Sequence, residues 1–77
     1  MKEIINQLQM IFRKIFDNQD LIITSDTTAD DIDDWDSLTH MQLIVEIEKK
    51  FGIKFTTAEI KKAANVGEFI DIIKDKI

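Results

Sequence analysis

The sequence predicts an all-α protein, a small four-helix bundle with three longer helices, one short helix and a long loop between the first two helices. Apolar residues recur with helical spacing in several segments. The 77 residues include no proline and only two glycines, so few breakers interrupt the helices. A chain of this length forms one domain with a thin core, which we place at residues 1–77.

We expect the first helix from Lys2 to Phe16. Its polar face is mostly Asn and Gln, which favours a helix facing the core over one lying on a membrane surface, where Lys and Arg would be common. The apolar residues make a single helical stripe: Ile4, Ile5, Leu8, Ile11, Phe12, Ile15 and Phe16.

The segment from Asp17 to Trp35 shows no helical period and is rich in Asp and Thr, which predicts a loop. A connection of this length is uncommon in a compact domain and is often functional. Five residues are candidate anchors into the core: Leu21, Ile22, Ile23, Ile32 and Trp35.

The second helix is expected from near Ser37 to near Phe51. Two lysines fall in its last turn, where the helix dipole favours cations, and Gly52 follows as the residue that ends it. Its apolar face includes Leu38, Met41, Ile44, Val45 and Phe51.

Two capping patterns predict the remaining helices. Thr56 and Glu59 form a capping box for a short third helix, and the pair Asn65 and Glu68 predicts the start of the last helix. The apolar face of the last helix is expected to contain Val66, Phe69, Ile70, Ile73 and Ile77.

The formal net charge of −5 is unevenly distributed along the chain. From Ile15 through Glu48 there are ten acids and no Lys or Arg, so this span carries −10 and the rest of the chain +5. A nucleic-acid partner is excluded because phosphate binding needs a basic face. The expected partners are proteins with basic patches.

The expected location of the protein follows from the absence of cysteine, from the charged residues near the start of the sequence and from the lack of a long apolar stretch. Without cysteine there is no disulfide, thiolate nucleophile or cysteine-based metal site. Lys2, Glu3, Arg13 and Lys14 break up the early apolar residues before a signal sequence can form, and no stretch is long enough to span a bilayer. We expect a cytoplasmic monomer that does not insert into membranes.

Hydrolytic catalysis by Ser37 fits the sequence poorly. There is no G-x-S-x-G motif, and the one histidine, His40, lacks an evident orienting acid and oxyanion hole. We therefore expect no enzyme activity and an exposed His40. A calcium loop is also excluded, because the cluster from Asp26 to Asp36 has no glycine, and no glutamate stands at position 12 counted from its later aspartates. No metal site is expected.

The tripeptide Asp36-Ser37-Leu38 has two interpretations. A serine in the first turn of a helix presents its hydroxyl beside free N–H groups and the positive end of the dipole, where a phosphodiester is well tolerated. Asp36 or Ser37 could equally be a simple helix cap. From the tripeptide alone, the capping interpretation is favoured.

The residues around it resemble the acyl carrier protein family. From Trp35 to Ile53 the sequence has the family's Asp-Ser-Leu opening of the second helix, then alternating apolar and acidic positions that end in Glu48-x-x-Phe51. Asp26 to Thr28 is similar to the family's loop approach to the serine. Helix order, length and acidity agree as well, so the resemblance covers essentially the whole chain.

The resemblance implies that Ser37 carries a 4′-phosphopantetheine arm. A phosphopantetheinyl transferase would attach the arm from coenzyme A with Mg²⁺, and the arm's thiol would hold acyl or aminoacyl groups as thioesters. Other partners would be loading enzymes and acyltransferases with basic patches. The implied partner contacts are Asp36, Leu38, Met41, Glu46 and Glu48.

Several positions depart from the pattern of fatty-acid-synthesis carriers. Trp35 replaces a small or aliphatic residue, Thr39 and Gln42 replace acids, and two lysines end the helix. These changes predict a specialised pathway, such as secondary-metabolite, polysaccharide or amino-acyl transfer chemistry. The alternatives are a housekeeping fatty-acid carrier and an unmodified acidic interaction module.

The charge distribution predicts a salt-dependent stability. Screening weakens repulsion within the acidic span, so the melting temperature should rise as sodium chloride or a divalent cation is added. Thermal unfolding followed by circular dichroism at several ionic strengths measures this. A melting temperature that does not change with salt would contradict it.

Overall fold

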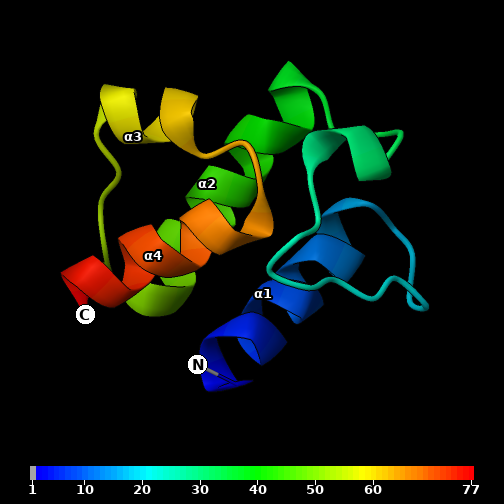
Figure 1. Ribbon diagram of the computed structural model, residues 1–77, viewed down its shortest axis with the longest axis horizontal. Helices are drawn as coiled ribbons and strands as arrows, with labels where there is room; N and C mark the ends of the chain where they lie inside the picture. Colours follow the sequence, from blue (N-terminus) through cyan, green and yellow to red (C-terminus); the bar gives the residue numbers. More distant parts are fainter. Residues whose placement is uncertain (1) are drawn as a thin grey trace.

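The structure, a computed structural model, describes residues 2–77 and is an all-α bundle (Figure 1). No strand occurs among these residues; one isolated bridge joins Thr28 and Asn65. The elements are α1 (Lys2–Ile15), a 3-10 turn η1 (Ala29–Asp31), α2 (Ser37–Phe51), α3 (Thr57–Lys62) and α4 (Val66–Lys76). Helix α1 packs against α2 and α4, while the short α3 lies on the side of the bundle away from α1. The predicted fold class is confirmed.

The core is one cluster built from faces of the three long helices, three residues of the long loop, and Ile53, Phe55 and Ala63, which flank α3. Phe12, Leu43 and Phe69 are completely buried at its centre. The other buried side chains of the three long helices are Ile4, Leu8, Ile11, Ile44, Ile47, Val66, Ile70 and Ile73.

Two predicted apolar faces were partly wrong. Ile77 was placed on the core face of α4 but is 65% exposed, because the helix ends at Lys76 and projects it beyond the bundle. On α2, the core face is formed by Leu43, Ile44 and Ile47. A second apolar stripe on roughly the opposite side of the same helix stays exposed, formed by Leu38, Met41 and Val45.

Local capping explains where the later helices begin and end. Gly52 ends α2 in the left-handed conformation, with φ of 66°, which glycine adopts without a steric penalty. The predicted Thr56 and Glu59 capping box is present at α3. The side chain of Asn65 accepts a hydrogen bond from Glu68 N at 2.8 Å, which caps α4.

The loop between α1 and α2 is anchored into the core, as predicted, at Ile23, Ile32 and Trp35. Ile22, also a predicted anchor, is 73% exposed. Neighbouring side chains of an extended segment point in opposite directions, and Ile23 is the one turned inward, its N–H donating to Gln9 Oε1 at 3.0 Å.

The start of α4 holds this loop in place through backbone hydrogen bonds. Val66 N donates to Thr27 O at 2.9 Å, and Gly67 N donates to Ser25 O at 3.0 Å. The first N–H groups of a helix have no partner within the helix, so the loop carbonyls satisfy them. These bonds fix the path of the chain on its way to Ser37.

The close approach at Gly67 predicts that Gly67→Ala destabilises the protein. A Cβ there would lie 2.8 Å from Ser25 O, so the loop or the helix must shift. This strain should outweigh the gain of about 1 kcal/mol that alanine brings to a helix. Thermal unfolding should show a melting temperature lower by several degrees. Lys74→Ala, on the exposed side of α4, should change it little. A Gly67→Ala protein that melts higher would contradict this account of the loop.

Candidate functional site

Ser37 is the first residue of α2 and is exposed where the long loop ends. Asp36 is the N-cap: its Oδ1 accepts a hydrogen bond from Thr39 N at 3.0 Å, and Asp36 N donates to Thr39 Oγ1 at 2.8 Å. The cap is therefore Asp36, one of the two residues that the sequence left open. The hydroxyl of Ser37 is not the group that caps the helix.

The surroundings of Ser37 are negatively charged. The hydrogen bond from Thr39 N holds the pKa of the Asp36 carboxyl below its usual range, because it stabilises the ionised form. The loop adds four exposed carboxylates just before it, from Asp30, Asp31, Asp33 and Asp34. A protein that approaches Ser37 therefore meets a concentrated negative field.

Within residues 2–77, no three His, Cys, Asp or Glu side chains converge to hold a metal ion. Asp31, in the middle of the acidic loop, uses its Oδ2 locally to accept a hydrogen bond from Thr28 N at 3.0 Å. None of the helices in this range has the length and apolar character needed to cross a membrane.

His40 joins the loop to α3, and the prediction that it is exposed was wrong. The indole N–H of Trp35 donates to His40 Nδ1 at 3.1 Å, and His40 Nε2 lies 2.8 Å from Ile60 O. Because Nδ1 accepts, the proton of the neutral ring is on Nε2 and is donated to that carbonyl. A buried indole needs an acceptor, so Trp35 was the sequence signal for this contact.

The bridge rules out His40 as a general base for Ser37 in this conformation. Both ring nitrogens are engaged, one by Trp35 and the other by Ile60 O. His40 is therefore not free to take a proton from the Ser37 hydroxyl. The site can supply a hydroxyl nucleophile to another enzyme's chemistry, but it does not assemble a base of its own.

A pocket of about 380 Å³ opens beside Ser37, between α2 and α3. Trp35 and His40 line it on the inner side, Met41 and Ile60 add apolar walls, and Lys61 contributes a cation. The lining is thus mainly apolar, with charged groups at Asp36 and Lys61.

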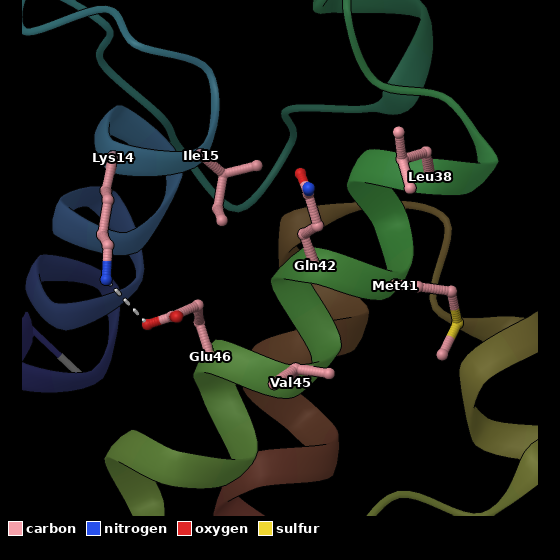
Figure 2. A pocket seen from close by; sticks show the side chains of 7 residues that line it. All are labelled: Lys14, Ile15, Leu38, Met41, Gln42, Val45 and Glu46. Carbon is pink, nitrogen blue, oxygen red and sulfur yellow. Dashed lines mark hydrogen bonds and ion pairs between the residues drawn. The ribbon is translucent and has the colours of Figure 1, made fainter.

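A second groove, of about 470 Å³, runs between α1 and α2 (Figure 2). It is lined by the exposed stripe of α2, with Leu38 69%, Met41 45% and Val45 44% exposed. At its other side Lys14 Nζ and Glu46 Oε2 form an ion pair of 3.3 Å, drawn as the dashed line in Figure 2. The predicted contacts Leu38 and Met41 are therefore side by side and accessible, within one turn of Ser37.

The other two predicted acidic contacts are engaged within the protein. Glu46 pairs with Lys14, and Glu48 Oε2 accepts a hydrogen bond from Phe55 N at 2.8 Å. Both side chains are half-buried. Glu48 therefore holds the connection between α2 and α3, a role that the sequence analysis missed because the partner is a backbone N–H.

Comparisons with known proteins agree with this geometry. Residues 6–73 match the family model described as "Phosphopantetheine attachment site". The chain is also similar to the solution NMR structure of a holo acyl carrier protein from Geobacter metallireducens, with 44% sequence identity and a TM-score of 0.86. That match covers 94% of this chain and 83% of the other.

The family model spans nearly the whole chain, and the similar structure has the same arrangement of helices. Proteins of this family are partners of phosphopantetheinyl transferases and acyl-handling enzymes and are not enzymes themselves. This chain belongs to the acyl carrier protein family, whose members carry acyl groups on a covalently attached 4′-phosphopantetheine.

Proposed function

We propose that Ser37 is the residue to which the 4′-phosphopantetheine arm is attached. The observation that carries the proposal is its placement: an exposed hydroxyl at the first position of α2, with the cap supplied by Asp36 instead. Unpaired N–H groups and the positive end of the helix dipole lie beside it, and these favour a phosphodiester. The residues present therefore fit the group.

The chain's own part in the attachment is to present the nucleophile. Ser37 Oγ forms a bond to the β-phosphorus of coenzyme A, the bond from that phosphorus to the nucleotide breaks, and the hydroxyl proton goes to a base of the transferase. His40 cannot take that proton while Trp35 and Ile60 O hold its ring. Once attached, the arm supplies the thiol that this cysteine-free chain lacks.

We further propose that this carrier acts in a specialised pathway in the cytoplasm, with acyl- or aminoacyl-loading enzymes as partners. The exposed side of α2 supports this, because it is apolar at Leu38, Met41 and Val45 and neutral at Gln42. Glu46 and Glu48 are engaged internally, and α2 ends in two exposed lysines. A partner selected for a uniformly acidic helix would find poor complementarity here.

The attachment predicts a change in intact mass. Incubation with coenzyme A, Mg²⁺ and a broad-specificity phosphopantetheinyl transferase should add the mass of one phosphopantetheine. The gain should vanish in Ser37→Ala and persist in Ser25→Ala, which removes the chain's other serine hydroxyl. No gain in the native protein would refute the carrier function and favour an unmodified interaction module.

The proposed pathway predicts slow reaction with fatty acid synthase enzymes. The holo protein should be loaded and elongated at least about tenfold more slowly than a housekeeping carrier, equivalent to roughly 1.4 kcal/mol of lost transition-state binding. If charge is the cause, the double variant Gln42→Glu with Lys49→Glu should recover part of the rate. Equal rates on the native protein and the housekeeping carrier would overturn the specialised assignment.

A further inference from the structure

The side chain of Trp35 fills the interior of the bundle directly behind Ser37. It is 8% exposed and, like His40, lines the pocket beside the serine. Its ring centroid lies 5.3 Å from that of Phe12 and 6.1 Å from that of Phe69, and both phenylalanines are completely buried. The indole therefore stands between the serine and the centre of the core.

Hydrogen bonds hold the indole in this position. Its N–H donates to His40 Nδ1 at 3.1 Å, and the imidazole is held in turn by Ile60 O. The centroid of the His40 ring is also 5.8 Å from that of Phe69. A rotation of Trp35 away from the core would leave its N–H without an acceptor and open a gap among packed side chains, and both changes are destabilising.

We propose that Trp35 excludes acyl chains from the core, and that the group carried on the arm is therefore a short or polar acyl group that remains exposed to solvent. The inference rests on the proposed attachment at Ser37 and deepens it, because it names the class of acyl group. Aminoacyl groups belong to that class, and long fatty acyl chains do not. Trp35 is then a specificity-determining residue.

The physical reason is the burial of apolar surface. A long acyl chain exposes hydrocarbon to water and is stabilised only where the protein can bury it. Protein interiors are close-packed, so a chain that enters beside Trp35 must displace side chains that already fill the space. A short acyl group exposes little hydrocarbon, and the ammonium of an aminoacyl group is better solvated by water. A filled core therefore costs such groups nothing.

A smaller side chain at residue 35 should reverse the exclusion. Removal of a large buried side chain leaves a cavity that the surrounding structure fills only in part, and an apolar cavity stays dry and binds hydrocarbon. In Trp35→Ala this cavity would be bordered by the rings that now contact the indole, those of Phe12, His40 and Phe69. We expect an acyl chain that stays outside the native core to enter this variant.

The test compares two acyl groups on the full chain. A broad-specificity transferase moves the whole acylated arm from acetyl- or octanoyl-coenzyme A to Ser37, with loss of adenosine 3′,5′-bisphosphate, and intact mass confirms each product. On the native protein, both forms should have the same melting temperature. With ¹³C-labelled protein and an unlabelled arm, isotope-filtered spectra should show no NOE from the octanoyl methylenes to the rings of Phe12 and Phe69.

In Trp35→Ala the octanoyl form should melt several degrees above the acetyl form, because a group that binds only the folded state stabilises it. NOEs from the octanoyl methylenes to Phe69 should appear. Phe51→Ala is the matched control and should show neither effect, because it removes a half-buried ring at the other end of α2 that does not line the pocket beside Ser37. If Trp35→Ala does not fold, Trp35→Leu leaves a smaller cavity and should show both effects to a lesser degree.

Three results would overturn the inference. A native octanoyl form that melts higher than the acetyl form, or that shows NOEs to Phe69, would mean that the chain enters the native core. NOEs to Leu38 and Val45 would place the chain in the groove between α1 and α2 and give a long acyl group a site of its own. The absence of both effects from the folded Trp35 variants would show that the indole is not what excludes the chain. A native protein that gains no mass from either coenzyme A derivative would instead refute the proposed attachment.

Discussion

The hydrogen-bonded bridge from Trp35 through His40 to Ile60 O connects the parts of the structure on which the site depends. It joins the end of the long loop, the first turns of α2 and the last turn of α3, and the Trp35 ring also contacts Phe12 and Phe69 in the core. The same two hydrogen bonds therefore give the buried indole an acceptor, order the loop before Ser37 and hold α3 beside the serine. A change at any of the three groups leaves a buried polar atom without a partner, which costs more than a surface bond would.

Features set by near neighbours in the chain could be predicted from the sequence, and features set by distant contacts could not. The caps at Thr56 and Asn65 and the left-handed Gly52 depend on residues within one helical turn, and all three were predicted. His40 was missed because its acceptor is twenty residues away. The buried side of α2 was misjudged because the helix has two apolar stripes, and periodicity alone does not say which one faces the core. The start of α2 at the serine was predicted and its cap was narrowed to Asp36 or Ser37, but the cation opposite them, on α3, was not predicted.

The arrangement of charge divides the surface at α2 and the loop before it into two parts. Around Ser37 the carboxylates are exposed and unscreened by neighbouring bases, apart from Lys61 across the pocket. Along α2 the carboxylates of Glu46 and Glu48 are instead occupied by Lys14 and by Phe55 N. Long-range attraction is therefore concentrated around the proposed attachment residue, while the exposed side of α2 offers an apolar surface. We expect different residues to govern the encounter rate with a partner and the specificity of the complex.

Helix α3 is only six residues long and contains no fully buried side chain. Its attachment to the bundle depends on the half-buried Ile60 and on a few polar contacts, chiefly Ile60 O to His40 and the ion pair between Glu59 and Lys76 at 3.1 Å. Stability within a protein is not uniform, and segments with little buried apolar surface open at the lowest free-energy cost. We therefore expect the amides of α3 to exchange with solvent hydrogen by local opening before those of α1, α2 and α4. One wall of the pocket beside Ser37 can thus move while the core that supports the serine remains folded.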